Sequence, residues 1–138
     1  MKQISKKIVI SMSEIKLKEI TSEIISFVKH SKIRNGILNL SILHTTASLI
    51  IQENADPDVL KDLENFYLKI APMDSFYSHS VEGLDDMPAH IKSSLTNSNL
   101  SISVIESELQ LGTWQGIFLF EHRQFKRNRT ILAHILGE

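Results

Sequence analysis

The sequence predicts an α+β fold with a largely antiparallel sheet and about three helices. Segments that alternate apolar and polar residues, as strands do, are mixed with segments of helical spacing. They do not follow the regular strand–helix–strand order that is typical of a parallel sheet. A chain of 138 residues with 42% hydrophobic content fits one domain with a buried core, so we expect a single domain over residues 1–138.

In the first half of the chain we expect three strands and one helix. Residues 7–12 alternate as a short strand, whereas residues 15–31 carry apolar side chains at helical spacing. Asn35-Gly36 is a turn signal, and it leads into a strand over residues 38–44. A further strand over residues 48–52 follows at once.

In the second half, Asp56-Pro57 predicts a helix start, because Asp is a favoured N-cap and Pro suits the first helical position. Pro72 ends this helix, and residues 73–84 are irregular. Asp86 is expected to cap a third helix. The remaining strands are expected at residues 100–105, 113–121 and 130–136.

Charge and composition exclude several classes of function. The net charge is −1, so no overall field attracts nucleic acid or an anionic membrane. The absence of cysteine excludes disulfides, thiolate nucleophiles and cysteine-based zinc sites. The first residues lack the apolar region of a signal peptide, and no stretch has about 18 consecutive apolar residues. We expect a cytoplasmic protein without membrane or nucleic-acid partners.

Three of the six histidines lie in polar stretches: His44 in LHTTAS, His79 in FYSHS and His90 in DDMPAHIKSS. Imidazole changes charge near neutral pH and is the commonest neutral metal ligand in proteins. We therefore treat the three side chains as parts of one candidate site that is assembled from distant segments. They are also candidate ligands of an open zinc-type site with room for water or substrate.

Polar residues near His44 extend this candidate site. His44 ends one predicted strand, and Glu53 and Asn54 end the next one, just before Asp56. A carboxylate and an amide beside an imidazole can orient it or coordinate a cation. Alternatively, His44 is a core histidine and the two acidic residues begin a helix; for Asp56 the capping interpretation is favoured.

The irregular segment before the third helix leads into a helix N-terminus, where free N–H groups bind anions. His90 lies about one turn into this helix, beside Lys92 and Ser94. These residues are suited to hold a phosphate group while Asp85 or Asp86 binds Mg²⁺ or moves a proton. The alternative is an ordinary capped amphipathic helix with a solvated polar face.

The only tryptophan lies between two glycines in LGTWQG, which predicts a bulge or a close backbone approach. The indole of Trp114 is suited to stack on an aromatic ligand, although packing in a core or subunit interface is the commoner use. The basic run from Lys126 to Arg129 is interpreted as a solvated loop.

Several motifs in a fixed order resemble the YjbQ family of small proteins: HTTASL, QENADP, YSHSVEGLDDMPAHIKSSL, LGTWQGIFLFEHR and the terminal LGE. The resemblance implies an α+β fold whose mixed, largely antiparallel sheet closes toward a barrel or sandwich, in a homotrimer. It also implies a weak thiamine-phosphate synthase activity, which joins hydroxymethylpyrimidine diphosphate to thiazole phosphate and releases pyrophosphate. A metal-dependent hydrolase with a three-histidine site, or a non-catalytic metal- or ligand-binding trimer, is the alternative.

Together, the residues and the resemblance give one set of expected site positions. The expected catalytic residues are His44, Glu53, His79, Asp86 and His90, of which the three histidines are candidate metal ligands. We expect a divalent metal, Mg²⁺ or Zn²⁺, a small phosphorylated ligand and no organic cofactor. The expected substrate contacts are Thr45, Thr46, Asn54, Asp85, Lys92, Ser94, Trp114, Gln115 and Glu121.

Overall fold

The computed structural model describes all 138 residues and contains eight strands and three helices. The strands are β1 (Lys2–Met12), β2 (Lys16–Glu19), β3 (Gly36–Ile42), β4 (Ala47–Glu53), β5 (Asn99–Ile105), β6 (Glu108–Leu109), β7 (Gln115–Glu121) and β8 (Arg127–Gly137). The helices are α1 (Thr21–Ser31), α2 (Pro57–Ile70) and α3 (Asp86–Leu95).

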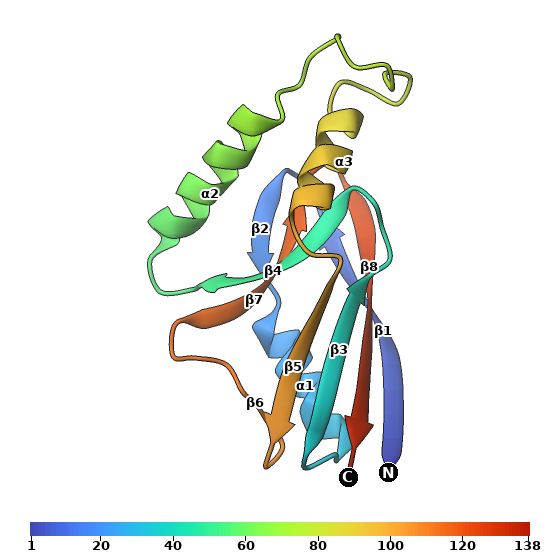
Figure 1. Cartoon of the computed structure of the whole chain (residues 1–138), viewed down its shortest axis with the longest axis vertical. Helices are drawn as coiled ribbons and strands as arrows, with labels where there is room; N and C mark the ends of the chain where they lie inside the picture. The colour runs from blue at the N-terminus through green and yellow to red at the C-terminus, as the bar shows by residue number, and fades with distance from the viewer.

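The strands form two sheets, with the orders β1-β8-β3-β5-β6 and β2-β7-β4. The sheets curl into a half-barrel, and α1 lies behind the larger one (Figure 1). The predicted α+β class and the three helices are therefore confirmed. Every strand pair is antiparallel, so the parallel component of a mixed sheet is not found.

The core lies between α1 and the sheets and comprises 19 buried apolar residues. Ile24 and Val28 face inward from α1 because they are four residues apart, on one side of the helix. Leu38 and Leu40 face the same core from β3, where alternate residues share one side of the strand. The two periodicities that predicted these elements therefore converge on one apolar interior.

The helix predicted over residues 15–31 begins only at Thr21. Residues 16–19 instead form β2, which pairs with β7. Leu17 is buried opposite Phe120, while its neighbours on either side are exposed, which is the alternation of a strand. The prediction that the helix begins at residue 15 was wrong. The strand has only four residues, and so short an alternating pattern is hard to distinguish from the helical spacing that follows it.

The C-terminus is tied into the fold. The backbone carbonyl of Glu138 accepts the N–H groups of Arg34 and Asn35 at 2.8 and 2.9 Å. A Cβ at Gly36 would lie 2.2 Å from the carbonyl oxygen of Leu136, so the predicted Asn-Gly turn needs its glycine for this close approach. Strand β8, the last strand of the chain, lies between β1 and β3 in the interior of the larger sheet.

The other two helices frame the upper end of the molecule (Figure 1). Helix α2 begins as predicted, because an Oδ1 of Asp56 accepts the N–H of Asp58 at 2.9 Å. It packs through Leu60, Leu63 and Tyr67 on a small cluster with Phe118 and Phe120. None of the three helices is long and apolar enough to cross a membrane.

Candidate functional site

Asp86 is the first residue of α3, and its carboxylate is the centre of a cluster of polar side chains. It does not cap the helix as predicted, because its oxygens are engaged by side chains instead. Oδ2 of Asp86 lies 2.6 Å from Nε2 of His79 and 3.3 Å from Nε2 of His90. His90 reaches the carboxylate because residues four apart share one face of a helix. His79 comes from the loop before α3.

The ligand atoms of His79, Asp86 and His90 all lie within 4.8 Å of one another, which suits a divalent cation. Metal–ligand bonds of 2.0–2.1 Å at a tetrahedral centre place ligand atoms about 3.3 Å apart. The His90–Asp86 separation has this value, and the His79–Asp86 separation is shorter. The two imidazoles are open to solvent while Asp86 is buried, so a cation and a ligand can approach from the histidine side.

A guanidinium group holds this carboxylate and its neighbour from behind. Arg123 lies 3.2 Å from Oδ1 of Asp86 and 3.2 Å from Oδ1 of Asp85. Burial alone raises the pKa of the Asp86 carboxyl, but the hydrogen bond from His79 and the charge of Arg123 outweigh burial and lower it below its usual range. Asp86 is therefore an anion at neutral pH, which is the form that binds a metal.

A polar cleft of about 330 Å³ adjoins this cluster and shares His90 with it. No apolar side chain lines the cleft. Its lining residues are His44, Thr45, His90, Ser93, Ser94, Thr96 and Ser98. A pocket of this kind suits a small polar or phosphorylated molecule rather than an apolar one.

His44 lines the cleft but lies outside the group of metal-ligating atoms. Its Nε2 accepts the backbone N–H of Thr130 at 2.8 Å. Burial and the nearby charge of Arg129 lower the pKa of His44, which keeps the ring neutral. A neutral imidazole whose Nε2 accepts carries its proton on Nδ1, so His44 offers a donor rather than a lone pair. Within one chain, the structure thus groups two of the three predicted histidines with Asp86.

Four of the predicted substrate contacts lie inside the protein. Lys92 and Glu121 are 1% and 0% exposed, and Thr46 is also buried. Glu121 pairs with Arg129, whose guanidinium also donates to the backbone oxygen and hydroxyl of Thr46. Asp85 is likewise buried and bound to Arg123. None of these buried residues lines the cleft, so a ligand in the cleft does not touch them in this arrangement.

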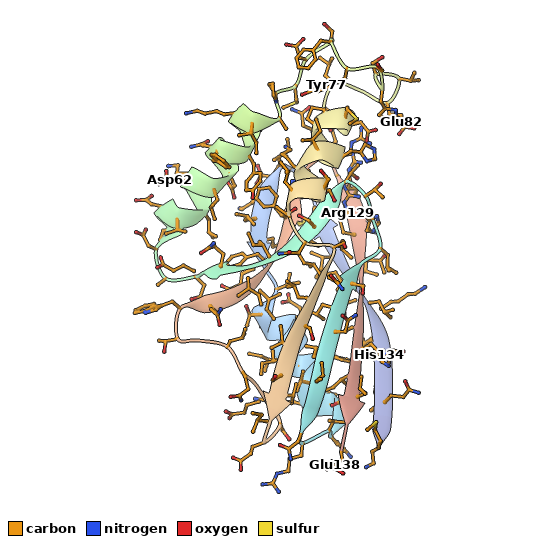
Figure 2. The ribbon with its side chains drawn as sticks, in the orientation of Figure 1. Asp62, Tyr77, Glu82, Arg129, His134 and Glu138 are labelled. Atoms are coloured by element: carbon orange, nitrogen blue, oxygen red, sulfur yellow. The ribbon has the colours of Figure 1, made fainter.

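The structure also identifies buried residues that the sequence interpretation missed. Arg129 was assigned to a solvated loop, yet it is 4% exposed in β8, beneath α3 (Figure 2). The signal was available, because Arg129 alternates with Ile131, Ala133 and Ile135 along the inward face of the strand. His122 is fully buried, with Nε2 2.9 Å from Oγ of Ser48.

Four predicted site residues lie at the opposite end of the second sheet. Strand β4 runs from the cleft to Glu53, which is about 20 Å at 3.3 Å per residue. Asn54 there donates to Oε2 of Glu19 at 3.1 Å, and Trp114 and Gln115 lie beside them. Trp114 is 63% exposed and therefore not a core residue. Within one chain these four residues do not meet the histidines.

The fold and the cluster define a class: a small half-barrel α+β protein with a His–Asp–His group beside a hydroxyl-lined cleft. A family model described as UPF0047 protein YjbQ-like matches residues 6–138. The UPF0047 protein of Synechocystis is 50% identical over 123 residues, which cover 88% of this chain and 84% of that protein. UPF0047 protein YjbQ of Salmonella typhimurium is 49% identical over 106 residues, or 77% of each chain. This chain belongs to the YjbQ-like UPF0047 family.

Solved structures support the same fold. An uncharacterised YjbQ/UPF0047 protein of Clostridium acetobutylicum superposes with a TM-score of 0.88 at 35% identity, over 95% of this chain and 99% of that one. A hypothetical protein of Aeropyrum pernix gives a TM-score of 0.90 at 24% identity, over 98% and 99% of the two chains. The resemblance found in the sequence motifs is therefore confirmed at the level of family and fold.

Proposed function

We propose that this protein is a metal-assisted enzyme that acts on a small phosphorylated molecule in the polar cleft. The observation that carries the proposal is the convergence of His79, Asp86 and His90 at the edge of that cleft. Two imidazoles and a carboxylate, with solvent on the fourth side, are a ligand set used by catalytic metal sites. No lysine or arginine lines the cleft, so a bound phosphate needs a cation for charge balance.

The reaction that we propose is the one implied by the family resemblance. Thiazole phosphate attacks the methylene carbon of hydroxymethylpyrimidine diphosphate through its ring nitrogen, the carbon–oxygen bond breaks, and pyrophosphate leaves. A divalent cation at the cluster would offset the negative charge on the departing pyrophosphate. The hydroxyl group of Thr45 is available to donate to a phosphate oxygen, and Arg123 keeps Asp86 anionic.

The test uses His79→Ala and His90→Ala, because both side chains are partly exposed and their loss leaves the core intact. Without a histidine tag, the native protein is expected to retain a divalent metal, measured by elemental analysis. Each variant is expected to lose that metal and to form thiamine phosphate about 100-fold more slowly or worse. His30→Ala, on the exposed side of α1, is the matched control and should behave as the native protein.

Two results would contradict the proposal. If the native protein held no metal after purification in metal-containing buffer, the proposed cation would not be part of the site. If both histidine variants formed product at the native rate, the cluster would have no role in the reaction. Loss of metal with unchanged thermal melting would show that the variants act at the site rather than on the fold.

Hydrolysis is the second candidate reaction. It is favoured by the open side of the cluster, where water can reach the ligand atoms of the two partly exposed histidines. The same preparations therefore need a parallel assay of phosphate release from the pyrimidine diphosphate alone. Phosphate release without thiamine phosphate would favour the hydrolase.

The proposed assembly is a homotrimer. It is supported by the family resemblance and by apolar side chains that a single chain leaves exposed beside the cleft, among them Leu43 and Leu95. A trimer could also bring Trp114 and Asn54 of one subunit toward the cleft of another. Sedimentation equilibrium is expected to give three times the 15.7 kDa chain mass, whereas a monomer at micromolar concentration would contradict this assembly.

A further inference from the structure

We propose that the free edge of β1 binds an extended acidic segment of a partner protein, which adds to the larger sheet as a further strand beside α1. Three observations carry the proposal: an unpaired strand edge, a groove that adjoins it, and lysines without ion-pair partners. None of the residues involved belongs to the cleft or to the His–Asp–His group. The proposal therefore does not depend on the proposed function.

Strand β1 is an outer strand of the larger sheet and pairs only with β8 (Figure 1). Residues 2–7 are all exposed, although they belong to a strand of 11 residues. A long edge strand presents a row of unpaired N–H and C=O groups, which is a template for pairing with another chain. Helix α1 leaves this edge open, because it packs mainly against β6, β7 and β8.

The register shows which backbone groups of β1 are free. The N–H of Leu43 donates to the carbonyl of Thr130 at 3.0 Å, so the even-numbered residues of β8 bond toward β3. The odd-numbered residues of β8 bond toward β1, where they lie opposite even-numbered residues. The odd-numbered residues of β1, such as Ser5, therefore direct N–H and C=O outward. The backbone oxygen of Ser11 accordingly accepts Nζ of Lys18 at 3.3 Å, outside the sheet.

A groove of about 530 Å³ lies between β1 and α1. Lys6 and Ile8 line it from the strand, and Glu23 and Phe27 are among the residues that line it from the helix. In strand addition, main-chain hydrogen bonds supply affinity and pockets for alternate side chains supply specificity. Because alternate residues of a strand share one face, every second side chain of an added strand would point toward this groove. Its apolar part suits apolar side chains at those positions.

The charge of the edge determines which strand can bind. Lys2, Lys6 and Lys7 are exposed, and none of them forms an ion pair within the protein. Strands β1 and β8 contain no Asp or Glu. Edge lysines oppose pairing with a second copy of the chain, because like charges would lie opposite each other. An acidic strand places opposite charges there instead, so the same lysines favour an acidic partner.

The first test locates the added strand by amide hydrogen exchange, followed by NMR. In the native protein, the outward N–H groups of Ser5 and Lys7 are expected to exchange fast, and those of Lys6 and Ile8 slowly. Saturation with acetyl-Glu-Val-Glu-Val-Glu-Val-amide should slow exchange at Ser5 and Lys7 by about tenfold and leave Lys6 and Ile8 unchanged. Absence of this slowing at the two outward groups would overturn the proposal.

The second test measures the affinity of the same peptide for edge variants. Ser5→Pro removes one outward N–H without removing a bond to β8, and proline is tolerated on edge strands. It should raise the dissociation constant about tenfold, whereas Ser5→Ala keeps the N–H and should bind as the native protein does. The double variant Lys6→Glu with Lys7→Glu keeps every N–H and should weaken binding at least as much. Unchanged affinity in Ser5→Pro or in the double variant would overturn the proposal.

Two competitors test the class of the partner. The matched basic peptide, acetyl-Lys-Val-Lys-Val-Lys-Val-amide, should not bind, and equal affinity for the two peptides would overturn the selection of acidic strands. A single-stranded DNA oligonucleotide is the other polyanion that lysines attract. It should not displace the acidic peptide, because it offers no strand backbone to pair with β1; displacement would overturn the assignment of a protein partner.

Discussion

Replacing Arg129 with methionine is expected to lower the free energy of unfolding by about 3 to 5 kcal/mol. Arg129 donates to both carboxylate oxygens of Glu121 and to Thr46, and the guanidinium and the carboxylate are both buried. Methionine fills much of the same space but leaves the charge of Glu121 inside the protein without its partner. An unpaired buried charge is among the costliest single changes that a fold can undergo.

The position of Arg129 makes the effect global rather than local. Arg129 lies in β8 of the larger sheet, Glu121 ends β7 of the smaller sheet, and Thr46 lies in the segment between β3 and β4. The ion pair therefore joins the two sheets directly beneath the cleft. Its loss should also disturb His44, whose partner Thr130 is the next residue in the chain.

Urea unfolding of three variants measures the effect. Arg129→Met alone should show the full loss, while the double variant with Glu121→Gln should recover part of it, because the amide is neutral and can still accept the N–H of His122. Lys126→Met, at an exposed position just before β8, should change stability by about 0.5 kcal/mol or less. A loss below about 1 kcal/mol in Arg129→Met, or no recovery in the double variant, would contradict this account.

The sequence predicted the elements whose periodicity is long or whose ends carry a strong signal. Helix α2 begins at Asp56-Pro57 because both residues favour the same position, and the strand at residues 38–42 alternates for its whole length. Strand β2 was missed because it is only four residues long and is fixed by pairing with β7, over 90 residues away. Such pairing depends on tertiary contacts that local pattern does not contain.

The candidate site was predicted only in part. The residues that were misplaced are again those whose positions depend on tertiary contacts. His79, Asp86 and His90 were named from their polar neighbours, and helical spacing alone explains why two of them meet. The sequence did not predict that Lys92 and Glu121 are buried, because each needs opposite charges brought from other elements. Nor did it predict that Asn54 and Trp114 lie one strand length away from the histidines.

Acid is expected to destabilise the protein well above the pH at which carboxylates titrate, and His122 is the main reason. Complete burial, reinforced by the charges of Lys92 and Arg129, lowers the pKa of His122 from 6.5 to about 2. Below pH 6.5 the unfolded chain binds a proton at this residue and the folded protein does not. Stability is therefore full above pH 6.5 and falls as the pH falls, by roughly tenfold in the folding equilibrium constant per pH unit.

The window between pH 6.5 and 4.5 isolates this effect, because Asp85 and Asp86 begin to matter only below their ordinary pKa of 3.8. Urea unfolding across the window is expected to show about a fiftyfold fall in the folding constant from His122 alone, in addition to a smaller fall from His44, whose pKa is also lowered. His122→Gln keeps a donor for Ser48 but cannot titrate, so its stability should depend much less on pH. If native protein and variant showed the same slope, His122 would not be the group through which acid destabilises the fold.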